Sequence, residues 1–302
     1  MRLPDWLVYT VVLTIIVAGL FWAERNARHP QSQEVEIAVA GVETPGAGTP
    51  AARKMPVARP EKDAADPQGP LLPDPDPFDE RVLVQVGDAE DGIGTAFAIN
   101  RSGMWLTARH VVDGCSRVGL SVGDGRMVRV DEVRTSHTSD LALLVTDRAP
   151  AALELNLGRE LRIGEAGYHV GFPQGRSGEA ASNLQSRSRL VTRGRYAMEE
   201  PVLAWAENAR SDGIEGTLSG MSGGPVFDKD GAVIGVIVAE SPRRGRIYTA
   251  TPDSISSFLE AQGLSAPGGE AYPLAASSYI KEADRMRDER AIVKVLCRVS
   301  DN

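Results

Sequence analysis

The segment Gly-Met-Ser-Gly-Gly-Pro, residues 220–225, has the composition that a nucleophilic serine requires. Such a serine needs an exposed hydroxyl group and backbone N–H groups directed at the oxyanion that forms during acyl transfer. Glycine residues on both sides of Ser222 allow a tight backbone turn, because glycine has no Cβ that would clash. A glycine-rich hairpin turn without a catalytic role is the alternative, and the hexapeptide by itself leaves both open.

A nucleophilic serine needs a general base, and the order of the histidines in the chain restricts the choice. The four histidines are His29, His110, His137 and His169. All precede Ser222, which excludes the G-x-S-x-G nucleophile elbow of α/β-hydrolases, where the histidine follows the serine. His110 follows a strand-like segment, Asp140 precedes another, and His169 lies inside a third, where we expect a structural role. The order His110, Asp140, Ser222 is the chymotrypsin type, in which the carboxylate orients the imidazole.

Three segments together resemble the signature motifs of trypsin-like serine peptidases. They are T-A-R-H-V-V (107–112), S-D-L-A-L-L (139–144) and G-M-S-G-G-P (220–225). The stretches GIGTAFAINRSGMWLTARHVV and GGPVFDKDGAVIGVIVA are similar to the bacterial HtrA-like branch of this family. The resemblance covers about residues 82–262, and three motifs in the correct order are a more specific signal than any one of them.

The resemblance implies an all-β, chymotrypsin-like fold of two six-stranded β-barrels, with a triad in the cleft between them. It implies a serine endopeptidase acting on protein or peptide substrates. His110 would act as general base and then acid, Asp140 would hold its tautomer, and Ser222 would attack the scissile carbonyl. The N–H groups of Gly220 and Ser222 would form the oxyanion hole. The pocket for the residue before the cut would be lined by Gly216, Val238, Ala239 and Glu240. No metal or organic cofactor is implied.

Some residues depart from the family pattern. Arg109 precedes the base where many relatives have a small or polar residue, and Met221 replaces the Asp or Asn that usually precedes the serine. Gly216 is not acidic, so a trypsin-like preference for Arg or Lys is not predicted. Only about forty residues follow Leu264, too few for the PDZ domain that most HtrA-like proteins carry. Because of these departures, a catalytically weak or inactive domain that binds a partner is the rival hypothesis.

The elements that must position these residues are mostly strands. From about Val82, short runs rich in Val, Ile, Leu and Thr alternate with glycine-containing turns, as in an all-β sandwich or barrel. Residues 252–263 have the apolar spacing of a short helix. We therefore expect a protease domain at 79–264, followed by a C-terminal extension at 265–302 that forms a helix and then a strand.

The N-terminal region has two further parts. Residues 6–22 read WLVYTVVLTIIVAGLFW, an uncharged run that spans about 26 Å as a helix. We expect a single transmembrane anchor at 1–24, in preference to a buried core helix or a cleaved signal peptide. Residues 25–78 are rich in Pro, Ala, Gly and charge, and predict a disordered linker. The expected location is the bacterial inner membrane, with the protease domain in the periplasm.

Charge and cysteine content limit the remaining possibilities. The net charge of −8 argues against nucleic-acid binding, because phosphate contacts need a basic face. Cys115 and Cys297 include no C-x-x-C pattern, so no structural zinc site is expected. Outside the cytoplasm these two cysteines form one disulfide, which would tie the C-terminal tail to the first barrel, whereas two buried thiols are the alternative. The sequence predicts no particular oligomeric state.

Overall fold

The computed structural model describes residues 35–38, 69–123, 125–264 and 268–300. The expected membrane anchor, residues 1–24, and most of the expected linker, residues 25–78, lie outside these ranges. Among the helices within the described ranges, none combines the length and hydropathy needed to cross a bilayer.

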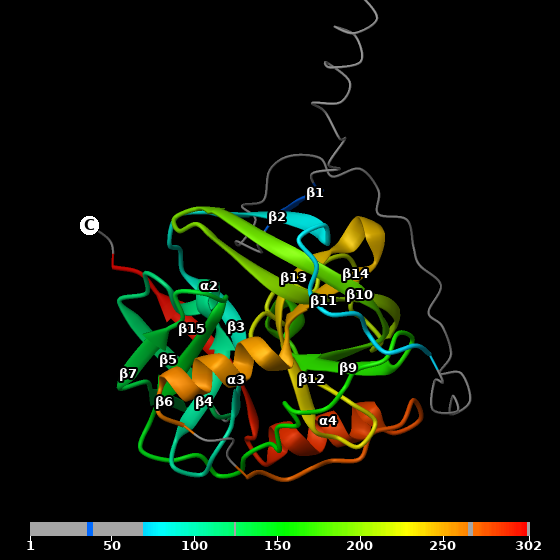
Figure 1. Ribbon diagram of the computed structural model, residues 1–302. Helices are drawn as coiled ribbons and strands as arrows, with labels where there is room; N and C mark the ends of the chain where they lie inside the picture. The colour runs from blue at the N-terminus through cyan, green and yellow to red at the C-terminus, as the bar shows by residue number, and fades with distance from the viewer. Residues whose placement is uncertain (1–34, 39–68, 124, 265–267, 301–302) are drawn as a thin grey trace, which may run out of the picture. The chain divides into compact units, whose positions relative to one another are not determined.

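The larger of two β-sheets contains eight strands, in the order β1-β2-β10-β11-β14-β13-β12-β9 (Figure 1). The first part of the long strand β10 pairs with β9, and its second part pairs with β2. Since β9 also pairs with β12, six strands of this sheet form a closed ring. The strands are β1 (Val35–Ala38), β2 (Glu80–Val86), β9 (Ala166–Gly171), β10 (Gly178–Gly194), β11 (Met198–Arg210), β12 (Pro225–Phe227), β13 (Val233–Ser241) and β14 (Arg246–Ala250).

The second sheet contains seven strands, in the order β6-β5-β15-β3-β4-β8-β7. It carries His110 and Asp140 next to the ends of two of its strands. The strands are β3 (Gly92–Ala98), β4 (Met104–Ala108), β5 (Arg117–Ser121), β6 (Met127–Arg129), β7 (Glu132–Thr135), β8 (Leu141–Val145) and β15 (Ile292–Arg298).

The prediction of an all-β fold is confirmed, whereas the two six-stranded barrels are not. The sheets have eight and seven strands instead of six each. Hydrogen bonding closes a ring only in the larger sheet; in the described part of the smaller sheet, the edge strands β6 and β7 do not pair with each other. Two complete barrels are therefore not established. One reason for the different count is β15, a strand from the C-terminal extension that enters the smaller sheet between β3 and β5.

The helical segments are short. They are α2 (Arg109–Val112), α3 (Pro252–Ala261), α4 (Tyr279–Asp288) and the 3₁₀ turns η1 (Pro173–Gly175) and η2 (Pro242–Arg244). The helix predicted at 252–263 is confirmed as α3, which begins where the Thr251 side chain accepts a hydrogen bond from the Ser254 N–H. The C-terminal extension forms a helix and then a strand, as its sequence predicts.

One apolar cluster joins the two sheets. Buried side chains of β3, β4 and β8, among them Phe97 and Leu106, belong to the same cluster as Tyr168, Phe227 and Val236 from the larger sheet. Each of these five side chains is at most 6% exposed. Because protein cores are close-packed, this contact fixes the two sheets relative to each other and fixes the residues at their shared edge.

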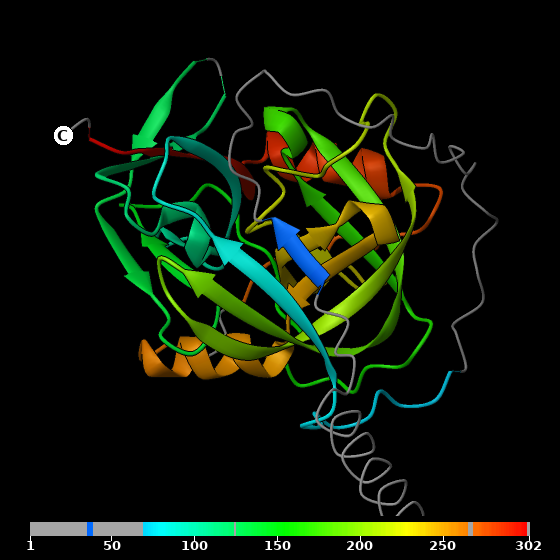
Figure 2. The same cartoon turned by 90° about the horizontal axis from the view of Figure 1, so that it is seen from above.

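The C-terminal strand is covalently fastened to the smaller sheet. Cys297 on β15 forms a disulfide with Cys115, which follows α2, and the two Cα atoms are 5.5 Å apart. The predicted bridge is confirmed. Figure 1 and Figure 2 both show the red C-terminal strand lying among the strands of the smaller sheet.

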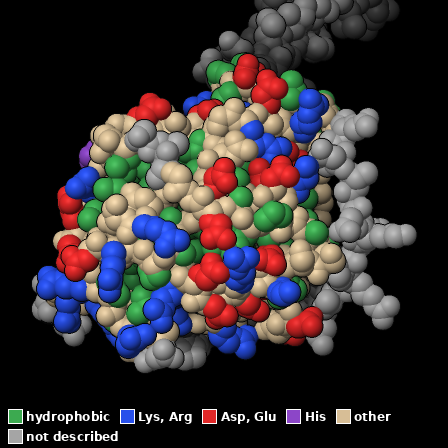
Figure 3. Space-filling view, turned by 90° about the horizontal axis from the view of Figure 1, so that it is seen from below, with side chains coloured by type: hydrophobic (Ala, Val, Ile, Leu, Met, Phe, Trp, Pro, Cys, Tyr) green, Lys and Arg blue, Asp and Glu red, His purple; other side chains and the backbone are tan. Residues whose placement is uncertain are grey.

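The last residues of the expected linker lie against the domain. The Leu72 N–H donates to the Leu161 carbonyl at 2.8 Å, and the Leu72 side chain is 8% exposed. Residues 69–72 thus lie against the protease fold, whereas residues 73–78 are exposed, Phe78 to 95%. The face seen from below carries interspersed acidic and basic side chains around apolar ones (Figure 3).

Candidate active site

Strand pairing brings His110 and Asp140 together. In the antiparallel pair β4–β8, Ala108 at the end of β4 lies opposite Leu141 at the start of β8. Asp140 directly precedes Leu141, and the one-turn helix α2 follows Ala108 and contains His110. Two residues that are thirty positions apart in the sequence therefore become neighbours as a consequence of one strand register.

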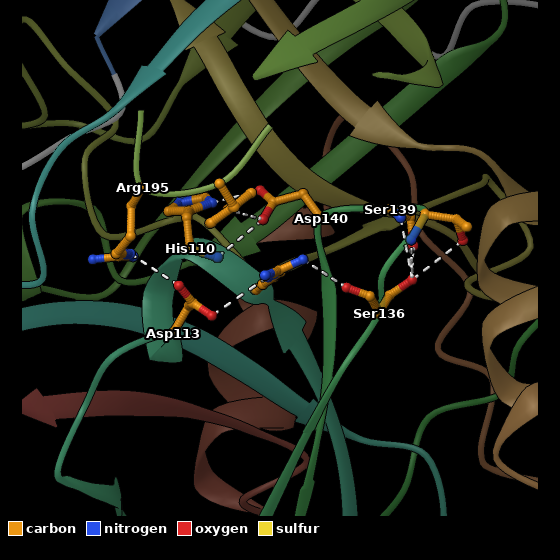
Figure 4. Close-up of polar contacts among 9 residues, drawn as sticks. His110, Asp113, Ser136, Ser139, Asp140 and Arg195 are labelled. Atoms are coloured by element: carbon orange, nitrogen blue, oxygen red, sulfur yellow. Dashed lines mark hydrogen bonds and ion pairs between the residues drawn. The ribbon is translucent and has the colours of Figure 1, made fainter. Parts of the chain in front are cut away.

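The two side chains form a tight hydrogen-bonded pair. His110 Nδ1 lies 2.5 Å from Asp140 Oδ2, and the His110 backbone N–H donates to Asp140 Oδ1 at 2.9 Å. The side chains are only 6% and 3% exposed. Figure 4 shows the imidazole and the carboxylate side by side. This arrangement leaves Nε2 as the ring nitrogen that can exchange a proton with a substrate or a nucleophile.

Two further residues, which the sequence did not predict, form hydrogen bonds with Asp140. The Tyr196 hydroxyl donates to Asp140 Oδ1 at 2.9 Å, and the Asp140 N–H donates to Glu200 Oε1 at 2.8 Å. Burial, and then the charge of Asp140, raises the pKa of both Tyr196 and Glu200. Tyr196 therefore stays a proton donor to the carboxylate over the physiological pH range. Both come from the β10–β11 hairpin, about sixty positions after Asp140, and no local motif in the sequence marks them.

Arg109, which departs from the family pattern, packs against Tyr196. Its guanidinium lies 4.0 Å from the centre of the Tyr196 ring and donates to the Ser136 carbonyl at 2.9 Å. A second arginine, Arg195, pairs with Asp113 at 2.9 Å (Figure 4). These contacts hold the tip of the β10–β11 hairpin against α2, so the arginine before His110 has a positioning role.

Ser222 is held between the two sheets. Its carbonyl accepts a hydrogen bond from the Thr95 N–H on β3 at 2.8 Å, while the chain continues into β12 of the other sheet. Gly223, with φ +84°, follows immediately, and a Cβ on it would lie 2.2 Å from Thr107 Oγ1. Only glycine fits this contact, which explains the glycine after the serine.

A cavity of about 340 Å³ is lined by Ser222, His110 and Gly220, among other residues. These three are the predicted nucleophile, the predicted general base and one of the two predicted oxyanion donors. Within the described structure, neither the Gly220 N–H nor the Ser222 N–H donates to another protein group, so both are available to a ligand. The same set of contacts includes no hydrogen bond between the Ser222 hydroxyl and His110. In apo sites such bonds are often long and shorten only when a substrate binds.

The predicted pocket residues lie apart from this cavity. None of Gly216, Val238, Ala239 and Glu240 is among the residues that line it. Val238 is 1% exposed and belongs to the apolar core. Glu240 accepts hydrogen bonds from the Thr217 hydroxyl and from the Leu218 N–H, and so connects the end of β13 to the segment before Ser222. Burial raises the pKa of Glu240.

Met221 and His169 have structural explanations. Met221 is 1% exposed in an apolar cluster of the larger sheet, so it fills space where relatives carry a polar residue. His169 is fully buried, bonds the Ser182 hydroxyl at 2.7 Å, and has the structural role that its strand-like context predicts. Among the described residues no group of three or more His, Cys, Asp or Glu side chains has the arrangement of a metal site.

A comparison with family models identifies the domain. Residues 94–236 match the family described as a trypsin-like peptidase domain. The chain carries a trypsin-like peptidase domain. This confirms the family that the three sequence motifs predict, including its HtrA-like branch.

Several curated relatives of the peptidase domain are serine proteases by name. The chain is 32% identical over 154 residues to the protein HhoA of Synechocystis sp., which covers 49% of this chain and 37% of that protein. It is 28% identical over 160 residues to the serine protease Do-like HtrA of Bacillus subtilis, covering 49% and 34%. The chain thus spans about a third of the length of these two relatives. A solved structure, the Rv3671c protease from M. tuberculosis in its active form, is 17% identical with a TM-score of 0.47, and the alignment covers 59% of this chain and 83% of that one.

Proposed function

We propose that this chain is a serine endopeptidase that hydrolyses peptide bonds of protein substrates with His110, Asp140 and Ser222. The observation that carries the proposal is the 2.5 Å contact between His110 and Asp140, next to a cavity lined by Ser222 and two free backbone N–H groups. The nucleophile, the base, the residue that orients the base and the oxyanion donors all lie in one place. This is the set of parts that acyl transfer requires.

In the first step the Ser222 hydroxyl attacks the scissile carbonyl carbon while His110 Nε2 removes its proton. Asp140 accepts from the Nδ1–H, which fixes the tautomer and stabilises the imidazolium that forms. The hydrogen bonds from the Tyr196 hydroxyl and the His110 N–H hold the Asp140 carboxylate in the orientation in which it accepts from the imidazole.

The negative oxygen of the tetrahedral intermediate lies between the N–H groups of Gly220 and Ser222. Donors of this kind are pre-positioned and act on charge that develops only in the transition state. The imidazolium then gives its proton to the leaving amine, and the C–N bond breaks. Water, activated by the same histidine, hydrolyses the acyl-enzyme and restores Ser222.

The pocket for the residue before the cut lies, in our proposal, between residues 216–218 and the end of β13. Support comes from Glu240, whose carboxylate joins these two segments through Thr217 and Leu218. Because these bonds occupy the carboxylate and burial raises its pKa, Glu240 is a poor counter-ion for a substrate cation. The proposal therefore includes no preference for Arg or Lys at this position.

We also propose that an N-terminal anchor tethers the domain to the bacterial inner membrane, with the protease facing the periplasm. The support is the uncharged run at 6–22, the polar sequence that follows it, and a disulfide, which is typical of oxidising compartments. Deletion of residues 1–24 is expected to release the protein from membranes without changing its kinetics on small peptides. Recovery of the full-length chain in the soluble fraction of lysed cells would reject the anchor.

Kinetics of single and double variants test the triad. Ser222→Ala and His110→Ala are each expected to lower turnover of a peptide substrate by about 10³-fold or more, and the double variant should be hardly worse. Losses that simply multiply would argue against a concerted unit.

A catalytically weak binding domain is the competing function, and the absence of a hydrogen bond between Ser222 and His110 is the observation in its favour. Measurement of peptide binding distinguishes the two. A chain that binds peptides at micromolar affinity, yet turns over none of a broad peptide library while fully folded, would be a binding module. Turnover that disappears in Ser222→Ala supports the peptidase.

A further inference from the structure

The C-terminal segment from α4 to β15, residues 279–298, has no part in the proposed chemistry. Its disulfide and two of its side chains nevertheless contact segments next to the candidate active site. We call it the C-terminal arm. Its strand lies between β3 and β5, and its disulfide joins Cys297 to Cys115 beside α2. Its helix lies below the larger sheet in Figure 1. Two of its cationic side chains point inward to one loop of that sheet, the connection between β9 and β10.

Arg287 of the arm binds both ends of this loop, residues 172–177. Its Nη2 atom donates to the Gly171 carbonyl at 3.3 Å, to the Gly178 carbonyl at 3.0 Å, and to the carboxylate of Glu179. The two charged side chains are only 7% and 3% exposed. Burying an ion pair costs desolvation energy that good hydrogen-bond geometry must offset, so such a pair often has a specific positioning role.

Lys294 of the arm binds the middle of the same loop. Its Nζ donates to the Gly175 carbonyl at 2.8 Å. The ammonium of Lys294 and the guanidinium of Arg287 also lie 5.8 and 5.7 Å from the centre of the Phe172 ring. The backbone and the aromatic ring of the loop are therefore held by the arm at four points.

The loop in turn holds the segment that precedes Ser222. The Gln174 N–H donates to the Ser219 carbonyl at 2.5 Å, and its side-chain amide donates to the carbonyls of Glu215 and Thr217 at 2.7 and 3.0 Å. Gln174 has φ 52°, a left-handed conformation that is uncommon for a residue other than glycine. Such a backbone persists where its surroundings fix it, and this happens mostly at functional sites.

This contact sets the direction of one oxyanion donor. The peptide unit between Ser219 and Gly220 is planar and trans, so its C=O and its N–H point in opposite directions. Because the Gln174 N–H binds the Ser219 carbonyl, the Gly220 N–H points away from that donor, and Gly220 is one of the residues that line the cavity. Gly220 has φ +95°, and a Cβ on it would lie 2.5 Å from the Phe172 carbonyl, so the loop and the glycine fit only in this arrangement.

We propose that the C-terminal arm is an intramolecular activator of the peptidase. Arg287 and Lys294 are positioning residues that fix residues 172–177, and this loop orients the Gly220 N–H through Gln174. The inference rests on the proposed function, and it adds that this chain supplies its own support for the oxyanion hole. Among the described residues no hydrogen bond or ion pair joins the arm to His110 or Asp140, so in this scheme it acts on stabilisation of the intermediate and not on the general base.

The test compares variants of the full chain. Lys294→Met removes one contact, and Arg287→Met combined with Glu179→Gln removes the other without leaving a buried carboxylate unpaired. The matched control is Arg285→Gln on the same helix, since Arg285 is half exposed and pairs only with residues outside the loop, Glu270, Glu282 and Glu289. The measurements are kcat and KM on a small peptide, the pH profile, thermal stability, and hydrogen exchange of the segment 213–224.

We expect both test variants to lower kcat about 10- to 100-fold with KM changed less than threefold, since loss of one oxyanion donor costs about 10²–10³. The pKa in the pH profile should not move. Hydrogen exchange in 213–224 should accelerate at least tenfold in the test variants and stay unchanged in Arg285→Gln. The conservative variant Arg287→Lys should recover part of the lost kcat.

Two results would overturn the proposal. One is unchanged hydrogen exchange in 213–224 in folded test variants, a readout that does not depend on any activity. The other is a kcat loss that merely follows thermal stability and appears equally in Arg285→Gln. Failure of the proposed function looks different, because the wild-type chain would then cleave no peptide, whatever the exchange data show.

Discussion

Removal of the disulfide between Cys115 and Cys297 should destabilise the domain strongly while leaving its fold intact. The bridge closes a loop of 182 positions, which contains Asp140 and Ser222 of the proposed triad but not His110. In the chain-entropy model, a loop of this length contributes about 5 kcal/mol of stability by restricting the unfolded chain. Measured contributions are usually smaller, so we expect a loss of about 2–5 kcal/mol.

The fold should survive because other contacts hold the same strand. β15 keeps its hydrogen-bond ladders to β3 and β5, and Val293 and Val295 on it are at most 2% exposed in the core of the smaller sheet. Without the bridge, the folded state thus keeps its packing, and most of the change lies in the unfolded state. For the same reason the peptidase activity of the folded fraction should change little.

Urea denaturation checks this prediction in three samples. They are the oxidised wild type, the wild type with a reductant, and the double variant Cys115→Ala, Cys297→Ala. The last two should unfold at similar, lower urea concentrations, and the reductant should have no effect on the double variant. A double variant whose free energy of unfolding lies within about 0.5 kcal/mol of the oxidised wild type would refute the reasoning, because closing the loop would then not restrict the unfolded chain.

Three further predictions concern buried groups. Burial lowers the pKa of His169 from 6.5 to about 3, so below pH 6.5 the folded state binds fewer protons than the unfolded state. The contribution of His169 to the free energy of unfolding is therefore full above pH 6.5. It is lost on acidification by about 1.4 kcal/mol per pH unit. His169→Phe should remove that part of the slope between pH 6.5 and 5 in denaturation experiments, and an unchanged slope would contradict it. Burial and the charge of Asp140 raise the pKa of Glu200, so its stabilising contribution is full below pH 4.5 and is lost as pH rises. Glu200→Gln, which keeps an acceptor for the Asp140 N–H, should therefore melt at a higher temperature than the wild type at pH 8; a lower melting temperature would contradict this. Tyr196→Phe should lower kcat about 10-fold or more, because a hydrogen bond to a charged group contributes about 1.5–3 kcal/mol, and unchanged kinetics would show that Asp140 does not need this donor.

The candidate site could be proposed from the sequence because its residues lie in short motifs. The three segments around His110, Asp140 and Ser222 each contain a candidate catalytic residue together with the strand or glycine turn that positions it. Because all four histidines precede Ser222 in the chain, the nucleophile elbow of α/β-hydrolases was excluded. One strand register then suffices to bring His110 to Asp140.

The residues that hold the candidate site in place could not be predicted from the sequence, because their contacts join segments that are far apart in the chain. Tyr196 and Glu200 reach Asp140 from a hairpin about sixty positions later, and Arg287 reaches residues 172–177 from more than a hundred positions later. Periodicity predicts that a segment forms a strand, but not which neighbours the strand selects. For this reason the sequence predicts a C-terminal strand but not that it lies between β3 and β5.

The identity of the nucleophile is the most direct test of the account. The full-length chain, folded and at pH 7.5, is treated with a fluorophosphonate, and the modified peptide is mapped by mass spectrometry. We predict one covalent adduct, on Ser222, which forms much more slowly in His110→Ala and is absent in Ser222→Ala. A folded chain that gains no adduct, or gains it on another serine at the same rate in all three proteins, would contradict the assignment of the catalytic triad.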